Sequence, residues 1–256
     1  TYADKKNIVG SPHAAALYKV NDRVSVWGGT SWGFRAPTLN ELYRQFSVGA
    51  VLTQANDQLG PERLFGWESG VNVEPIRNLT WRTTVFDDRF THAVSNITIL
   101  PPNLQQRQNV GRTQIWGIQS DVEYRLFSDW KITSAYLYDL GQVKEFEQNP
   151  AIVGRVLAQV PRNRGTFGVE YTNTKLADVA VQYHYTSVQY DDDLNTLTRR
   201  LGGFGTVDLT VSRQLRENLD VFFNLQNMFD KEFVVQTNPR TIGTPRLFSF
   251  GFRIHI

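Results

Sequence analysis

Apolar and polar residues alternate with a period of two from one end of the chain to the other. In the segment 114–126, for example, Trp116 and Ile118 fall on one face of an extended strand, whereas Gln119 and Asp121 fall on the other. This spacing is typical of a strand that meets an apolar environment on one side and a polar environment on the other. Helical periodicity is rare in the chain, so the pattern predicts an all-β fold.

The connections between the expected strands alternate between short and long. Short turns such as 74–78 and 127–129 alternate along the chain with long connections such as 35–63, 96–109 and 140–164. Loops above about 12 residues are uncommon in compact domains, whereas an antiparallel up-and-down barrel in an outer membrane has short periplasmic turns and long extracellular loops. The pattern therefore predicts a transmembrane β-barrel with about eleven strands, at 11–20, 23–34, 64–75, 79–94, 111–126, 130–139, 165–172, 179–190, 204–215, 219–228 and 246–256.

Strand length and aromatic placement agree with a bilayer. Ten residues of a strand rise about 33 Å, and a tilt near 45° reduces this to about 23 Å, close to the apolar band of an outer-membrane barrel. The tryptophans all fall within expected strands, where they are predicted to form aromatic girdles: Trp27, Trp32, Trp67, Trp81, Trp116 and Trp130.

The last expected strand, 246–256, shows the alternation most strongly. Phe250 and Phe252 occupy one face, and Arg253 and His255 the other. We expect the phenylalanines to face lipid and Arg253 to face the barrel interior, with the C-terminus on the periplasmic side because the strand follows a long connection. The same alternation assigns a polar set of the strand 111–126 to the interior: Gln119, Asp121, Glu123 and Arg125.

Composition narrows the functional classes. The chain has 256 residues, of which 41% are hydrophobic and 20% charged, as expected for one large domain or part of one. Its 27 basic and 25 acidic residues are spread along the chain without a basic stripe, so no nucleic-acid partner is expected. Cysteine is absent, which excludes disulfides and thiolate metal sites. No run of 18 apolar residues is present to form a transmembrane helix.

Residue types suited to catalysis are scattered. The histidines show neither HExxH nor a paired ligand spacing. His184 and Ser187 lie close in the sequence, but an odd offset places them on opposite faces of one expected strand. The sequence therefore predicts neither an enzyme, nor a metal site, nor a cofactor.

A first candidate for substrate binding is the loop 43–57. Tyr43, Arg44 and Phe46 combine a guanidinium with aromatic rings above the expected barrel mouth, and Arg35 lies at the end of the preceding strand. Such groups suit the anionic, aromatic surface of a ferric catecholate complex. The alternative is that the loop packs on other loops without touching a ligand.

A second candidate is the run "YDDDLN" at 190–195. Tyr190 and Asp191 are its first residues, and two further aspartates follow. Clustered carboxylates suit a calcium ion or a cationic ligand. The alternative is a solvated loop tip.

Several motifs have a physical reading of their own. Pro37 ends a strand because it lacks a backbone donor, and the sequence from Thr38 to Glu41 predicts a capped helical turn directly after it. Gly117 is expected where a long strand twists or admits a bulky neighbour.

Six stretches, taken in order, resemble one family. They are "GFRAPTLNELY" (33–43), "LGPERL" (59–64), "NVGRTQIWGIQSDVEY" (109–124), "VPRNRGTFGVEY" (160–171), "LQNMFDKEF" (225–233) and "GTPRLFSFGFRIHI" (243–256). In kind and order they are similar to the barrel of the TonB-dependent outer-membrane receptors, which import ferric siderophores, cobalamin and similar scarce nutrients. One departure is Ile256, where such barrels usually end on an aromatic residue.

This resemblance carries expectations for the whole chain. Residues 1–256 would be the C-terminal part of a larger barrel, which has 22 strands in this family, with the plug domain absent. Partners would be TonB, the plug, outer-membrane lipid and a ferric siderophore or cobalamin-like ligand, in the bacterial outer membrane. A passive porin-like channel and a soluble β-rich binding protein are the alternatives.

Overall fold

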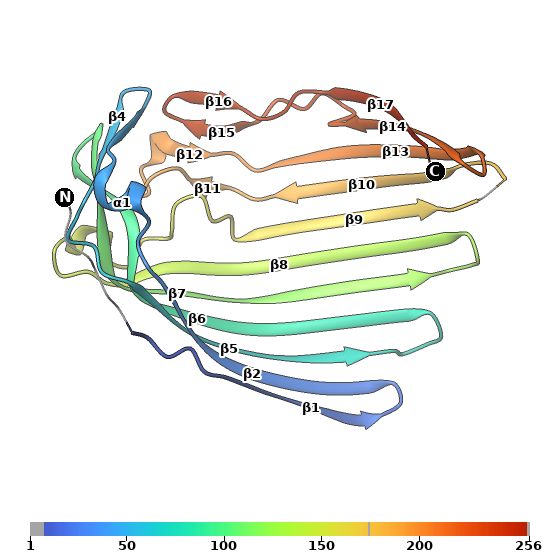
Figure 1. Cartoon of the computed structure of the whole chain (residues 1–256), viewed down its shortest axis with the longest axis horizontal. Coiled ribbons are helices and arrows are strands. Elements are labelled where there is room, and N and C mark those ends of the chain that lie inside the picture. The colour runs from blue at the N-terminus through green and yellow to red at the C-terminus, as the bar shows by residue number, and fades with distance from the viewer. Residues whose placement is uncertain (1–7, 174, 255–256) are drawn as a thin grey trace.

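The computed structural model describes residues 8–173 and 175–254, whose long strands form one large sheet (Figure 1). Its main strands are β1 (His13–Asn21), β2 (Val24–Arg35), β5 (Glu62–Val73), β6 (Leu79–Leu100), β7 (Leu104–Arg125), β8 (Trp130–Glu145), β9 (Asn163–Tyr171), β10 (Asp178–Thr186), β13 (Phe204–Arg216), β14 (Leu219–Gln226) and β17 (Leu247–Ile254). They are hydrogen-bonded in this order, each antiparallel to its neighbours. The all-β, up-and-down prediction is confirmed, with eleven strands along the path.

The two ends of the sheet differ in their connections. Short turns lie at one end, and the small elements of the long loops gather at the other (Figure 1). These are α1 (Leu39–Tyr43), β3 (Phe46–Val48), β4 (Val51–Gln54), β11 (Gln189–Tyr190), β12 (Arg200–Leu201), β15 (Val234–Thr237), β16 (Arg240–Ile242) and the 3-10 turns Pro150–Ile152 and Leu197–Arg199. No helix among the described residues is long and apolar enough to cross a membrane.

The hairpin of β6 and β7 corrects one sequence-based prediction. The segment 96–109 was expected as a long loop, but the strands remain paired up to Leu100 and Leu104, so only a tight turn separates them. Ile97 and Val110 are almost fully buried in this extension. The strand was not recognised in the sequence because residues 105–108 are all polar, so neither face of the strand is apolar there. Likewise β8 continues to Glu145, beyond the predicted end at residue 139.

The helical turn predicted after Pro37 is present. Thr38 is the N-cap of α1, and its hydroxyl accepts a hydrogen bond from the Glu41 backbone N–H at 3.3 Å. The Glu41 carboxylate in turn accepts one from the Thr38 backbone N–H at 2.7 Å. This reciprocal pair is a capping box, which satisfies two backbone donors at the start of a helix.

The main buried cluster lies in the loops. Within the described residues, Ile97, Val110, Val143, Phe146 and Ile152 pack together there, with Leu157 and Leu194 against them. These residues come from the extended β6–β7 hairpin, from the end of β8 and from the loops that follow. The loop end of the molecule is therefore a packed structure with a core of its own.

The two faces of the sheet have opposite character. Residues directly opposite on neighbouring strands share a face, and the register places a set of exposed aromatic side chains on one face: Trp32, Trp67, Trp81, Trp116, Trp130, Phe167, Tyr183 and Phe250. Phe250 is 75% exposed. We call this the apolar face.

Trp27 is the exception among the tryptophans. It lies opposite Gly70, one position out of phase with the apolar face. Its prediction as part of an aromatic girdle was therefore wrong, because only the parity along the strand decides the face.

Candidate functional site

The opposite face of the sheet is lined by polar side chains, and we call it the polar face. Its register runs without a break from Arg125 through Lys131 and Glu170 to Ser249 on β17. This continuity places the predicted interior residues on one face: Gln119, Asp121, Glu123, Arg125 and Arg253. That this face lines a barrel interior stays a prediction. His255 and Ile256 lie outside the described residues.

Charged side chains on the polar face pair with one another. Arg125 contacts Glu123 at 3.1 Å, and Lys131 contacts Glu170 across the β8–β9 pair at 2.7 Å. The Gln119 amide donates to the Asp121 carboxylate at 2.9 Å. The face thus presents a hydrogen-bonding surface of mixed charge.

Three aromatic rings also lie on the polar face, each opposite a glycine. The pairs are Trp27 with Gly70, Phe86 with Gly117 and Phe222 with Gly251. A Cβ at Gly70 would stand 2.6 Å from the Trp27 indole nitrogen, and one at Gly117 2.9 Å from the Phe86 ring. The rings therefore lie close over the glycine backbone. Sequence reasoning expected a bulky neighbour at Gly117 and missed the other two pairs, for which an aromatic residue out of phase with the apolar face was the available signal.

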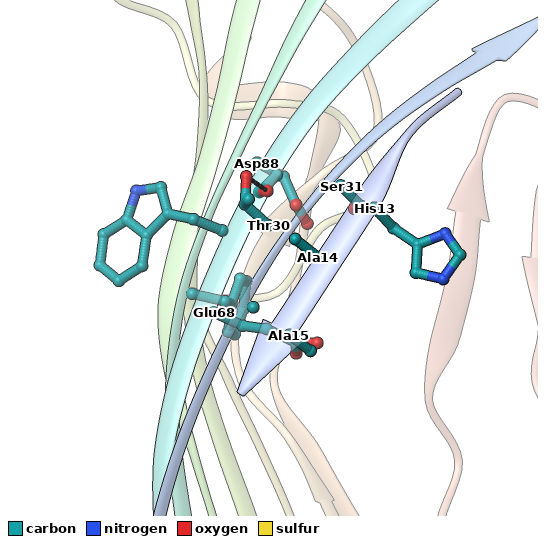
Figure 2. Close-up of a pocket in the computed structure, with 11 residues that line it drawn as sticks. His13, Ala14, Ala15, Thr30, Ser31, Glu68 and Asp88 are labelled. Atoms are coloured by element: carbon teal, nitrogen blue, oxygen red, sulfur yellow. Dashed lines mark hydrogen bonds between the residues drawn. The ribbon is translucent and has the colours of Figure 1, made fainter. Parts of the chain in front are cut away.

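A small pocket opens at the β1 edge of the polar face (Figure 2). It holds about 330 Å³, and its lining includes His13, Ser31, Glu68 and Asp88. The His13 imidazole points away from Asp88 in Figure 2. In the part of the chain that the structure describes, no group of three or more His, Asp or Glu side chains could hold a metal ion. This pocket was not predicted from the sequence, because its residues come from separate strands.

Arg35, predicted to bind substrate, joins α1 to β5. Its guanidinium contacts Glu41 at 2.9 Å and Glu62 at 2.7 Å. These carboxylates, Glu62 foremost, raise the pKa of Arg35 above its ordinary value. Partial burial opposes ionisation of Glu41, but hydrogen bonds from Arg35 and from Thr38 outweigh it and lower the pKa of Glu41 to about 2.

The other residues of the first candidate loop are gathered around Arg107. The Arg107 guanidinium lies over the Phe46 ring at 4.9 Å and donates to the Arg44 carbonyl at 2.9 Å. The Arg44 side chain itself is exposed, and Tyr43 is half-buried. Arg107 was missed in the sequence because the segment around it was expected to be a loop, and no local pattern relates it to residues 43–46.

The second candidate loop connects three parts of the molecule. Asp191 accepts hydrogen bonds from the Gln159 amide at 2.8 Å and from Thr237. Asp193 accepts from the Thr98 hydroxyl at 2.8 Å. Asp192 accepts from the backbone N–H of Thr196 at 2.9 Å, within its own loop. The consecutive carboxylates therefore bind different elements, which replaces both readings of this run, the calcium cluster and the solvated tip.

These contacts join the loops over one cavity. It holds about 400 Å³ and is lined by the aspartates 191–193, by Gln159 from the β8–β9 connection and by Ile97 and Gln105 from the β6–β7 hairpin. The first candidate loop reaches the same assembly, because the turn at Gly49 lies against Pro239. Tyr190 pairs with Arg200 beside the cavity. The structure thus brings the two predicted loops into one assembly at the loop end.

A meander of long antiparallel strands, with one exposed apolar face and one polar face and with long loops packed at a single end, defines the wall of an outer-membrane-type β-barrel. The chain belongs to the family described as "TonB dependent receptor-like, beta-barrel", whose profile matches residues 1–228.

Solved structures share this fold. A mutant of the ferric enterobactin receptor PfeA from Pseudomonas aeruginosa, in complex with enterobactin, superposes with a TM-score of 0.75 at 17% identity, over 95% of this chain and 40% of that one. The copper transporter OprC matches with a TM-score of 0.73 at 16% identity, over 94% and 39%. The siderophore receptor PiuA from Acinetobacter baumannii matches with 0.72 at 17%, over 94% and 35%. The chain therefore spans well under half the length of the structures it resembles.

Proposed function

We propose that this chain is part of the barrel wall of a bacterial outer-membrane receptor that takes up a scarce nutrient, such as a ferric siderophore, by TonB-dependent active transport. The observation that carries the proposal is the division of one continuous sheet into an exposed aromatic face and a charged face. An aromatic face of this extent is stable in contact with lipid, whereas soluble proteins rarely expose one.

Residues 1–256 are proposed to be the C-terminal part of a larger barrel. Among the described residues, β1 and β17 are the two edges of the sheet and do not pair with each other. An open edge in lipid leaves backbone N–H and C=O groups without partners, so further strands would pair with both edges. The polar face, with Gln119, Asp121 and Arg253, would then contact water or a plug domain, and the loops would lie outside the cell with the C-terminus on the periplasmic side.

The loop assembly is the proposed place of ligand capture. Arg44 and Tyr43 offer a cation and an aromatic ring at this end, and Phe46 lies beneath the Arg107 guanidinium. Tyr190 lines a separate pocket next to the cavity described above. Cations and aromatic rings favour an anionic, aromatic ligand such as a ferric catecholate. Arg35 and Asp191 would position the loops through the contacts described above.

An uptake assay tests the proposal. Cells that lack their own siderophore receptors are given the full-length protein and radiolabelled ferric catecholate, with and without TonB. We expect uptake that requires TonB and stops when the proton gradient is dissipated. Uptake that continues without TonB would favour a passive channel, and competition by cobalamin in place of the siderophore would identify a different substrate. Full-length protein that is soluble and monomeric without detergent would contradict the membrane assignment.

A further inference from the structure

Three arginines form a cluster where the apolar face gives way to polar residues near the loop end. They are Arg63 on β5, Arg89 on β6 and Arg112 on β7, and we call them the arginine cluster. The register places Thr91 directly opposite both Arg63 and Arg112. Because adjacent strands lie about 4.8 Å apart, the Cα atoms of these two arginines are about 10 Å from each other.

Arg89 belongs to the same cluster and lies closer to the row of exposed aromatic side chains on the apolar face. It is two residues before Thr91 on β6, a rise of about 6.6 Å, and it stands opposite Phe65 and Gln114. The next position along each neighbouring strand, away from the loops, is Trp67 on β5 and Trp116 on β7. The arginine cluster therefore lies directly on the loop side of an aromatic row, on the same face of the sheet.

The position of the cluster separates it from the proposed path of the nutrient. Its residues share the parity of the apolar face, whereas Gln119 and Asp121 share the opposite parity. Side chains of opposite parity point to opposite sides of a sheet. A ligand of the arginine cluster is consequently a molecule outside the barrel wall.

The charges of the cluster are only partly compensated. Arg89 contacts Asp87 at 2.8 Å, and Arg112 contacts Glu145. Both arginines remain about half exposed, at 53% and 49% of the side-chain surface. Exposed ion pairs of this kind contribute little to the free energy of folding. The Arg63 side chain makes no hydrogen bond or ion pair within residues 8–173 and 175–254, and it is exposed.

From this arrangement we infer that the arginine cluster binds the phosphate groups of a phosphorylated glycolipid in the outer leaflet of the membrane. Interfacial tryptophans lie at headgroup level. The arginines of the cluster lie on the loop side of Trp67 and Trp116, so their guanidinium groups are at the height of the lipid phosphates. Guanidinium groups bind phosphate through paired, charge-assisted hydrogen bonds. The inference rests on the membrane placement proposed above, and it adds a lipid ligand that is separate from the transported nutrient.

The test compares matched arginine variants of the full-length protein, extracted from outer membranes in mild detergent. One variant is R63Q/R89Q/R112Q, and the control is R23Q/R77Q/R82Q, which removes the same charge from exposed positions in the short turns and on the polar face. Each protein is titrated with bisphosphorylated lipid A, with the dephosphorylated lipid and with inorganic phosphate, and binding is read by native mass spectrometry. Outer-membrane fractionation and a heat-dependent gel shift confirm that each variant is inserted and folded.

We expect wild type and control to bind the bisphosphorylated lipid at least about 10-fold more tightly than the dephosphorylated lipid, and the cluster variant to lose this preference. Should the cluster variant fail to insert, the single change R63Q, at an exposed residue without a partner, is expected to show a smaller loss in the same direction. An unchanged preference in the folded cluster variant overturns the inference, and so does equal binding of both lipids, or binding of inorganic phosphate as tight as that of the lipid. A wild-type protein found in the soluble fraction overturns the membrane assignment as well, which distinguishes the two failures.

Discussion

Asp191 accepts two hydrogen bonds from Thr237, one from the backbone N–H at 2.8 Å and one from the hydroxyl at 2.6 Å, across a separation of 46 residues. This contact joins the loop after β10 to the β15–β16 hairpin. The other oxygen of Asp191 holds Gln159 from a third loop. One carboxylate therefore fixes the relative positions of three connections at the loop end.

Asp191→Ala is expected to release these loops from one another. Hydrogen bonds to a charged group contribute about 1.5 to 3 kcal/mol each, so local opening should become at least 10-fold more frequent. Hydrogen–deuterium exchange at the Thr237 amide measures this opening. Asp22→Ala, in the exposed turn between β1 and β2, is the control. Unchanged exchange at Thr237 would show that the loops are held by other contacts.

Glu41 is expected to make α1 sensitive to acid. Because the pKa of Glu41 is lowered from 4.5 to about 2 in the folded protein, its contribution is fully present above about pH 4.5 and is lost as the pH falls towards 2. Protection of the α1 amides from exchange, corrected for intrinsic rates, should decline over this window. The variant Glu41→Gln should show a weaker helix whose protection is nearly independent of pH there, and a wild-type helix with flat protection from pH 5 to 2 would argue against the lowered pKa.

Substitutions of Arg35 and of Arg44 are expected to affect different properties, the first the stability of α1 and the second ligand binding. Arg35→Gln removes the bridge between Glu41 and Glu62, so it should raise exchange in α1 by several-fold. Arg44→Gln changes an exposed side chain, so it should weaken ligand binding by about 10-fold and leave exchange unaltered. Titration of each variant with the ferric ligand completes the comparison. A stability loss in Arg44→Gln without a binding loss would remove Arg44 from the proposed ligand site.

Phe250 and Arg253 test the assignment of the two faces. Phe250→Arg places a charge on the apolar face, which costs about 2 to 4 kcal/mol at mid-bilayer, so insertion of the full-length protein into the outer membrane should fail. Arg253→Gln should be mild, because this residue lies on the polar face opposite Asp220. The amount of folded protein in outer-membrane fractions gives the measurement. Equal losses in both variants would contradict the facing.

Gly70 tests the aromatic rings that lie over glycines. Gly70→Ala forces a Cβ to within 2.6 Å of the Trp27 nitrogen and 2.8 Å of the Thr83 carbonyl oxygen, and overpacking of this kind typically costs about 1 to 3 kcal/mol. Gly28→Ala is the matched control, since its nearest atom would be 3.6 Å away. Urea unfolding followed by gel shift compares them, and equal midpoints would show that Trp27 moves aside without cost.

The eleven strands were predictable because each carries its own alternation. A β-strand places successive side chains on opposite faces whatever its neighbours are, so the facing of Phe250 and Arg253 follows from local sequence. The capped turn at Thr38 was predictable for the same reason, since its partners lie three residues apart. By contrast, the extension of the β6–β7 hairpin, in which Ser95 pairs with Gln108 and Asn96 with Arg107, was not recognised. Its strand residues beyond the apolar band are mostly polar, so they lack the alternation of apolar and polar positions.

The sequence by itself determined the number of long strands and which side chains of a strand share a face, because these depend on alternation within a few residues. Only the tertiary structure decided that Asp191 accepts hydrogen bonds from Thr237 and that Arg35 forms an ion pair with Glu62. It also decided that Arg63 and Arg112 lie on either side of one threonine. Each of these pairs joins residues on different strands or loops. Their meeting depends on strand register and on how the loops fold over one another, and neither is encoded in the local alternation of apolar and polar residues.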